Sequence, residues 1–424
     1  MWDKILQIWK IKDIRNNILV VVALLAAFRL MAHVPVPGVN LANLKFFFES
    51  NQLLGLMNLF SGGTMENFSI VMLGVGPYIT ASIIFQLLGM IVPKLEEMMK
   101  EGESGQQKIN MYTRWLTVPL AFFQSYGMIR LLSNSARPIL TDLTTIRMVT
   151  IMLTITAGTM FLMWLGEIIS EKKVGNGLSL IIFAGIVSSF PSSIRNTLIN
   201  YTSADFYTLV VFVGVAILTV VAVVFISEGQ RNIPVNYAKQ MRGNKVMGGN
   251  MSHLPLRVNM AGVIPIIFAI SLVLFPSMVA QFFVHAQTAW LAAAAVGTIN
   301  LFQNQIFYGA TYFVLVFGFT YFYTAVIFHP QKIAENLQRQ GGFIPGIRPG
   351  KETEKYLGMT VNRINLIGAL FLGIIAVLPL IMQNAGGVQG LQIGGTSILI
   401  VVSVAIEIAK QIEAQLTMHE YEMV

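Results

Sequence analysis

The chain contains uncharged, mostly apolar stretches that are too long for the interior of a soluble domain. Two of them, residues 258–331 and 364–406, contain no Asp, Glu, Lys or Arg. A bilayer crossing needs about 20 mostly apolar residues, so each stretch is long enough to cross more than once. Only 11% of all residues are charged, against roughly a quarter in soluble domains. The chain is therefore predicted to fold in lipid, and the absence of strand-like alternation predicts helices.

The intervals between charged residues locate ten predicted membrane spans. Glycine-rich and polar breaks divide the two longest intervals into two spans each, and the apolar stretch 289–299 is too short to cross. The predicted spans are 16–34, 67–93, 115–132, 148–166, 174–194, 206–227, 262–277, 306–328, 365–382 and 396–411.

The distribution of basic residues predicts the orientation of these spans. With the N-terminus in the cytoplasm, 22 of the 28 lysine and arginine residues fall on the cytoplasmic side. Cytoplasmic loops of membrane proteins are enriched in these residues, so both termini are predicted to be cytoplasmic. The basic loops 228–257 and 329–363 are the longest on that side.

Ten spans divide into two halves of five, residues 1–202 and 203–424, with opposite orientation. Inverted halves are common in transport proteins. The fold predicted from the sequence is thus an all-α polytopic membrane protein. Its ten transmembrane helices form two inverted five-helix halves around a central pore.

Sequence signals for enzymes, metal ions and cofactors are weak. Arg29 is the one charge well inside an apolar run, and the glutamates 167, 228 and 407 fall at span ends, where solvation at the interface is expected. The GESG and SEKK motifs at 102–105 and 170–173 lie in charged loops, not beside a catalytic partner. The chain has no cysteine, and its five histidines lack ligand spacing. We predict no enzymatic activity, no metal site and no cofactor.

Two short segments do not fit a simple span. Residues 53–60 are apolar but too short to cross, and Ser61, Gly62 and Gly63 follow them. This segment is either an interfacial helix or a movable cap. Residues 74–88 begin with glycine and proline inside a predicted span, and broken helices are tolerated only against a cavity or protein.

Several of these stretches resemble the SecY family of bacterial protein-conducting channels. The matching motifs run from one end of the chain to the other. They are VPVPG at 34–38, residues 74–88, GESG at 102–105, TAGTMFLMWLGE at 156–167, GNG at 175–177, VNYAK at 235–239, HLPLRVNMAGVIP at 253–265, GGFIPGIRPG at 341–350 and GGTSILI at 394–400.

The resemblance implies an hourglass-shaped channel with an apolar ring at its narrowest point, a plug helix and a gate that opens sideways to lipid. The gate would lie between the second and seventh spans, beside the third and eighth. The plug maps to about residues 54–67, with Leu56, Met57, Asn58, Leu59, Phe60, Ser61, Gly62 and Gly63 at its centre. The ring maps to Val75, Ile79, Leu178, Ile182, Ile267 and Ile400, and these six are called the ring residues below.

The resemblance also implies partners in the bacterial cytoplasmic membrane. These are small membrane subunits (SecE and SecG), a cytoplasmic ATPase motor (SecA), the ribosome, signal sequences, nascent chains and the lipid bilayer. The expected docking residues are Arg242, Lys245, Arg257 and Arg348. The expected function is passage of unfolded secretory proteins across the membrane and lateral release of membrane spans. A solute transporter with inverted repeats is the alternative.

Overall fold

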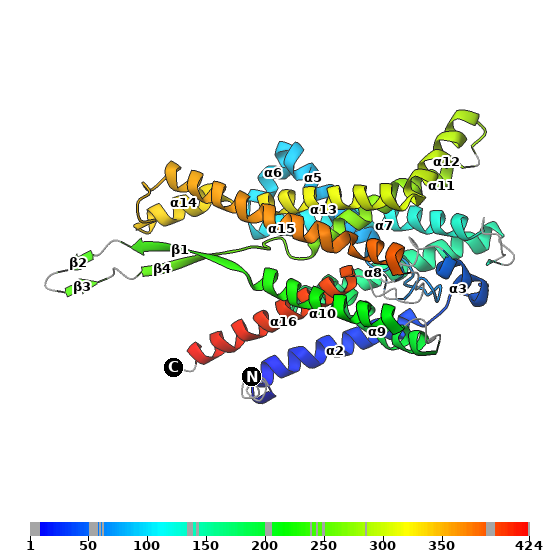
Figure 1. The fold of residues 1–424 in the computed structure, drawn as a ribbon, viewed down its shortest axis with the longest axis horizontal. Helices are drawn as coiled ribbons and strands as arrows, with labels where there is room; N and C mark the ends of the chain where they lie inside the picture. The colour runs from blue at the N-terminus through cyan, green and yellow to red at the C-terminus, as the bar shows by residue number, and fades with distance from the viewer. Residues whose placement is uncertain are drawn as a thin grey trace.

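Helices make up most of the chain in a computed structural model (Figure 1). The structure describes residues 9–50, 58, 61, 63–133, 139–140, 144–199, 206–237, 240–242, 245–247, 251–284, 286–386 and 395–422. In the first half the helices are α2 (Lys12–Ala32), α3 (Leu41–Ser50), α5 (Gly76–Ile91), α6 (Pro93–Lys100), α7 (Glu103–Ser133), α8 (Thr145–Glu171) and α9 (Gly177–Ile199). In the second half they are α10 (Phe206–Glu228), α11 (Ile264–Phe283), α12 (Ala289–Gln303), α13 (Gln305–Ile327), α14 (Pro330–Arg339), α15 (Lys351–Gly386) and α16 (Gly395–Glu422).

A helix overlaps each predicted span, but the helices differ in how well they could cross a membrane. Among the described residues, α2, α8, α10, α13 continued by α14, and α15 are long and apolar enough to cross alone. The pair α5 and α6, bent by 109°, would form a sixth crossing if it counts as one span. Ala289–Gln303 is a shorter apolar helix, as are the first parts of α9 and α11.

The predicted span 67–93 is wrong in its first third, which is not helical. Residues 63–75 form mainly turns, and α5 begins only at Gly76. Gly74 has a φ of 57°, which breaks any helix before this point, and Pro77 fits the first turn of a new one.

The prediction of an all-α chain is wrong in the long basic loops. Strands β1 (Gln230–Tyr237) and β4 (Met251–Arg257) form an antiparallel hairpin, paired from Gln230 with Arg257 to Asn236 with Met251. Strands β2 (Gln240–Arg242) and β3 (Lys245–Met247) pair beyond it, and β5 (Gly342–Phe343) joins the free edge of β1. Buried Ile233 and Val235 alternate with exposed residues, the period-two pattern of a half-buried strand.

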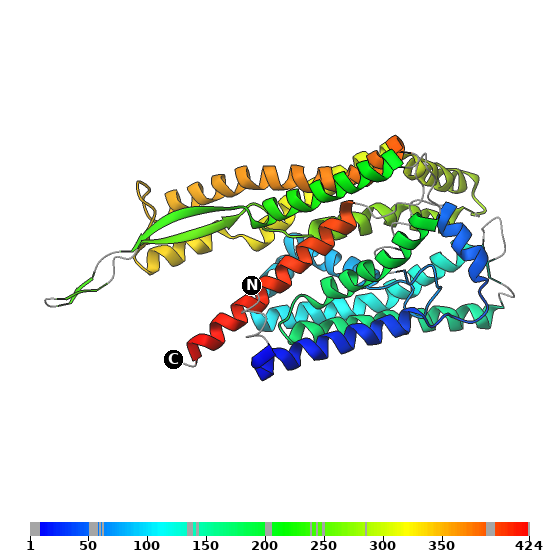
Figure 2. The same cartoon turned by 60° about the horizontal axis from the view of Figure 1, so that its bottom comes forward.

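The two basic loops share one apolar core. Ile233, Val235 and Leu256 of the hairpin pack with Leu337 of α14 and with α15 residues that include Leu357 and Val361. In Figures 1 and 2 the hairpin, α14 and the start of α15 lie together at one end of the molecule, with β2 and β3 at the tip. The two loops therefore fold together as one unit that continues into α15. This unit, which consists of the hairpin, β5, α14 and the start of α15, is called the basic unit below.

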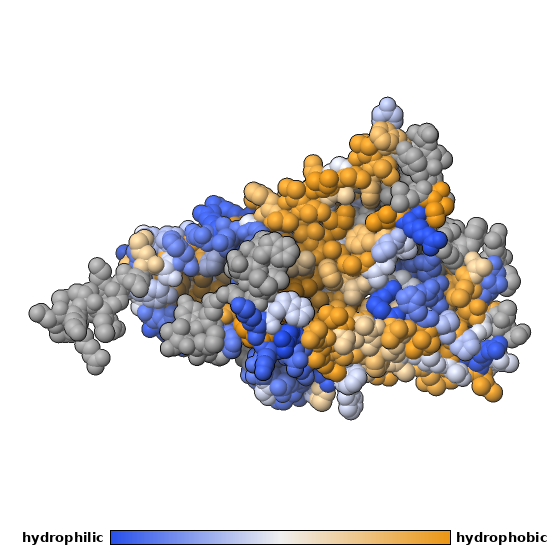
Figure 3. All heavy atoms as spheres, turned by 90° about the horizontal axis from the view of Figure 1, so that it is seen from below, coloured by the Kyte–Doolittle hydropathy of each residue, from blue (hydrophilic) through white to orange (hydrophobic). Residues whose placement is uncertain are grey.

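The largest apolar cluster lies among the long helices and includes residues of α2, α5, α8, α9, α10, α11, α13, α15 and α16. Large apolar side chains are also exposed, above all on α10, where Val211, Leu218 and Phe225 are more than half exposed. Figure 3 shows apolar side chains across the middle of one face and hydrophilic ones toward the hairpin end. Such a surface suits contact with lipid and would be a liability in water.

Helix α8 passes very close to the non-helical segment before α5. A Cβ atom at Gly158 would collide with the carbonyl oxygen of Ile70, whereas one at Gly318 of α13 would meet open space. We expect Gly158→Ala to lower the free energy of unfolding by about 1–3 kcal/mol, because backbone would have to move. Gly318→Ala should leave it unchanged or raise it by about 0.5–1 kcal/mol. Thermal unfolding in detergent measures both, and equal melting temperatures would contradict this account of the α8 contact.

Candidate functional site

The six ring residues all lie in or against one large apolar cluster. Val75 precedes α5 and Ile79 lies in its first turn, Leu178 and Ile182 lie in the first two turns of α9, Ile267 lies on α11 and Ile400 on α16. Five of them are at most 9% exposed and belong to the large apolar cluster, and Leu178 is partly buried against it. Segments spread over more than 300 residues of sequence thus contribute aliphatic side chains to one large apolar cluster.

Helices α5 and α11 begin in the same way. Gly74 and Gly262 have φ values of 57° and 64°. The next residues, Val75 and Val263, are buried N-caps with nearly equal φ and ψ of −92°, 4° and −94°, −8°. A proline follows in the first turn of each helix. The amide nitrogens of Ile79 and Ile267 then donate to the carbonyl oxygens of Val75 and Val263, at 3.1 and 3.3 Å.

Sequence reasoning missed Val263 as a candidate. It is 4% exposed and belongs to the same apolar cluster as Val75. The available signal was the motif G-V-x-P, which occurs at both 74–77 and 262–265.

A capped turn positions Leu178. The side-chain oxygen of Asn176 accepts hydrogen bonds from the backbone nitrogens of Leu178 and Ser179, at 3.1 and 3.2 Å. This is the N-cap geometry that satisfies free donors at a helix start. Gly177 approaches the carbonyl oxygen of Gly166 so closely that a Cβ atom would collide with it. The start of α9 is therefore fixed against the end of α8.

Only part of the predicted plug can be examined. Leu56, Met57, Leu59, Phe60 and Gly62 lie outside the described residues, and Asn58, Ser61 and Gly63 lie within them. The side chain of Asn58 donates to Glu66 at 3.1 Å and accepts from the Glu66 backbone nitrogen at 3.0 Å. The Thr64 hydroxyl donates to the carbonyl oxygens of Ser61 and Met72 at 3.0 and 3.2 Å. These bonds link Asn58 to Glu66, and Ser61 and Met72 to Thr64.

The predicted docking residues lie on the hairpin and on the loop that leads to α15, and they are not gathered at one point. Arg242 and Lys245 pair across β2 and β3 near the tip, and exposed Arg257 ends β4 at the base. Arg348 is also exposed, and its backbone carbonyl accepts a 2.9 Å hydrogen bond from the Thr353 hydroxyl. Arg257 and Arg348 are thus exposed basic residues at two separate points of this end of the molecule.

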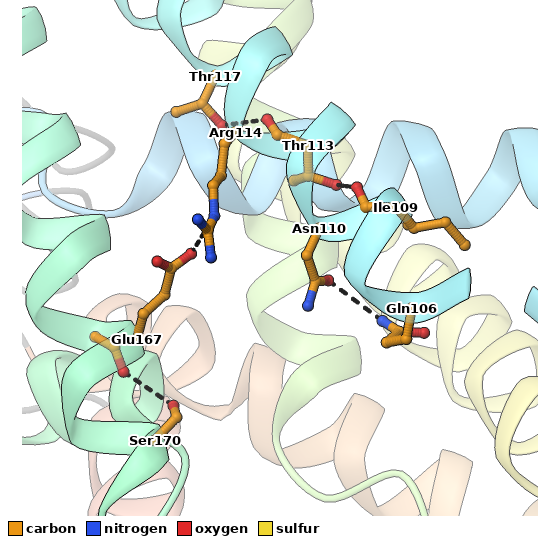
Figure 4. A network of polar contacts seen from close by, with 9 residues as sticks. Gln106, Ile109, Asn110, Thr113, Arg114, Thr117, Glu167 and Ser170 are labelled. Atoms are coloured by element: carbon orange, nitrogen blue, oxygen red, sulfur yellow. Dashed lines mark hydrogen bonds and ion pairs between the residues drawn. The ribbon is translucent and has the colours of Figure 1, made fainter. Parts of the chain in front are cut away.

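Two of the glutamates predicted to be solvated at span ends form ion pairs. Glu167 of α8 accepts from Arg114 of α7 at 2.6 Å (Figure 4), and Glu228 of α10 lies 2.8 Å from Lys410 of α16. Near Glu167, the Ser170 hydroxyl donates to the Gly166 carbonyl and accepts from the Gly177 nitrogen. These contacts join neighbouring helices.

The site offers little for catalysis. The ring residues are aliphatic, and the described part of the chain contains no group of three or more metal-ligating side chains of the His, Cys, Asp or Glu type. An aliphatic site can exclude water and ions, but it supplies no nucleophile, acid or base.

Comparisons with known proteins find close relatives over almost the whole chain. A family model described as SecY matches residues 69–409. The protein translocase subunit SecY of Corynebacterium glutamicum is 43% identical over 437 residues, which cover 99% of this chain and 98% of the relative.

Solved structures share the fold. One described as a protein conducting channel has a TM-score of 0.61 and 17% identity, over 93% of this chain and 90% of its own. Sec61 in the canine ribosome-channel complex from the endoplasmic reticulum has a TM-score of 0.59 and 16% identity, over 93% and 90%.

Proposed function

Because this chain belongs to the SecY family, it is a subunit of a protein-conducting channel in the membrane, and we propose that the six ring residues form the seal of that channel. The observation that carries the proposal is that five of the six are buried in one apolar cluster and that Leu178 packs against it. The channel passes proteins across the membrane without being an enzyme. The solute-transporter alternative has no support among these relatives.

An aliphatic ring suits the two demands on such a channel. A passing chain carries polar backbone and needs a wet path, whereas the resting membrane must not leak ions. Aliphatic side chains exclude water when they touch each other, and they can fit around a chain of any sequence. A span that leaves sideways gains free energy because its apolar residues enter lipid.

The proposed architecture is ten spans in two inverted halves, residues 1–202 and 203–424, with both termini cytoplasmic. The common start of α5 and α11 supports it, because these are the second spans of their halves. Each pairs a valine N-cap with an isoleucine four residues later, namely Ile79 and Ile267. Two halves that repeat one local structure are expected from inverted repeats.

The proposed plug, residues 54–67, would cover the ring from outside when no chain is present. Support comes from the hydrogen bond of Thr64 to the Met72 carbonyl, which ties the plug to the segment that leads into Val75, and from the bond of Asn58 to Glu66 within the plug. A plug held near Val75 can move away from the ring and return to the same position.

The proposed partners follow from the basic unit at the hairpin end. One relative of similar fold is described in a ribosome-channel complex. Exposed Arg257 and Arg348 suit the acidic surface of a ribosome or of an ATPase motor of the SecA type. The exposed apolar helices suit lipid and small subunits of the SecE and SecG type. Signal sequences and nascent chains would pass between α5 and α11.

We expect polar substitutions in the ring to open the seal. Replacing Ile79 and Ile182 with asparagine removes roughly 1.5 kcal/mol or more of apolar burial at each site. Such a change can raise resting ion flux by on the order of tenfold. Asparagine at both Ile267 and Ile400 should raise it in the same way. Ion flux across vesicles at equal protein yield measures the effect.

Leu357→Asn with Val361→Asn in the core of the basic unit is the matched control, and it should leave ion flux normal. Equal flux from ring and control variants would refute the ring.

The proposed topology can be tested cleanly because the chain has no cysteine. Single cysteines at Asn244 and Lys351 should react with an impermeant thiol reagent only from the cytoplasmic side, and one at Gln287 only from outside. Labelling of the Gln287 position from the cytoplasm would exclude ten spans in this orientation.

We expect Arg348→Glu to abolish motor-driven transport while insertion, yield and ion tightness stay normal. The substitution keeps the hydrogen bond from the Thr353 hydroxyl, because that bond goes to the backbone carbonyl of Arg348. Arg348→Lys should be a poor substitute, because lysine lacks the planar guanidinium. Arg339→Glu, an equal charge change at the exposed end of α14, is the control. ATP-driven transport of a secretory precursor into vesicles is the measurement, and normal transport by Arg348→Glu would exclude a coupling role.

A further inference from the structure

Helix α16 belongs to the second half of the chain but also contacts the first. In Figure 2 it lies between α10, α13 and α15 on one side and α2, α7 and α8 on the other. It packs against α10 and α15 of its own half and against α9 of the first. Its outer part carries the ring residue Ile400, and its cytoplasmic part extends to Glu422.

The cytoplasmic part of α16 rests on the turn that joins α8 to α9. The Gln415 side-chain nitrogen donates to the Lys173 carbonyl oxygen at 2.7 Å, across 242 residues of sequence. Ile408 lies beside Gly175 in the same turn, 3.5 Å from the position of a Cβ atom there. Lys173 has a φ of 56°, a left-handed conformation that is rare for a residue with a side chain. Lys173 directly follows the C-cap of α8, where a left-handed residue commonly ends a helix, and Gln415 bonds its carbonyl.

A second polar contact ties α16 to its own half. Lys410, five residues before Gln415, lies 2.8 Å from the carboxylate of Glu228 at the end of α10. Both side chains are about 40% exposed, so water screens the pair and its main effect is on position. Lys410 and Gln415 thus connect one helix to both halves at the cytoplasmic side.

We propose that the cytoplasmic part of α16 is a fixed strut that joins the two halves and sets the distance between Ile400 and the ring residues of α9. Gln415 is its positioning residue. The Lys173 carbonyl lies four residues before α9 begins, and Leu178 and Ile182 lie in the first two turns of that helix. One hydrogen bond therefore fixes both helices of the pair. The ring then has a stationary side, α9 with α16, and opens on the side of α5 and α11.

The proposal rests on the ring of the proposed function. If Ile79→Asn with Ile182→Asn leaves ion flux unchanged, the ring itself fails. If that pair raises flux and the Gln415 variants below do not behave as expected, only the strut fails. The same vesicles, containing the assembled translocase, serve for both.

The first test compares two substitutions of Gln415. Gln415→Met keeps the length of the side chain but removes the donor, and Gln415→Lys keeps a donor. Loss of one hydrogen bond shifts the equilibrium between the closed and open ring by about fivefold. The methionine variant should therefore raise resting ion flux by about that factor, and the lysine variant should leave ion flux unchanged. Gln411→Met is the control, since the described part of the chain shows no hydrogen bond from that side chain. Methionine and lysine variants that behave alike would overturn the proposal.

The second test asks whether the strut has to open. Cysteines at positions 173 and 415, joined by a short bis-maleimide, would lock α16 to the α8–α9 turn without relying on either native side chain. ATP-driven transport of a secretory precursor should continue at the rate of the same protein without cross-linker. A block of transport after cross-linking would show that these segments separate during passage, and would overturn the fixed strut even if the methionine variant fails to fold.

Discussion

Contact between buried aliphatic side chains of distant segments is the interaction on which the rest of this structure depends. A membrane channel for unfolded chains cannot select its cargo by charge or hydrogen bonds, and it must still hold back ions when idle. Val75, Ile182 and Ile400 are buried in one cluster although they come from distant parts of the sequence. Each surrounding element can be understood by how it places one of these side chains.

Local contacts fix the start of α9 and the start of α15. Asn176 caps α9, and the glycine contact between Gly166 and Gly177 holds its start against α8. The shared core of hairpin, α14 and α15 makes the basic unit a continuation of α15, a 36-residue helix. A force applied to the basic unit is therefore transmitted directly to α15.

The sequence predicted the apolar helices better than it predicted the contacts between them. Charge spacing located helices such as α8 and α10, because lipid imposes one rule on every span. The hairpin was missed because its alternation, Ile233 with Val235, is short and lies among basic residues. The bond from Gln415 to Lys173 could not be predicted, since 242 residues separate its ends and local patterns carry no signal for it.

Three of the proposed ring residues, Val75, Ile79 and Ile267, lie at helix starts, where free backbone N–H groups would normally make a site polar. At α5 the Gly76 nitrogen donates to the Leu73 carbonyl, and Pro77 has no N–H to leave free. At α11 the Ile266 nitrogen donates to Val263, and Pro265 has the same effect. Turns and prolines thus remove donors that could bind a passing backbone. An apolar ring needs this as much as it needs isoleucine, because one unpaired donor would attract both water and substrate to the narrowest point.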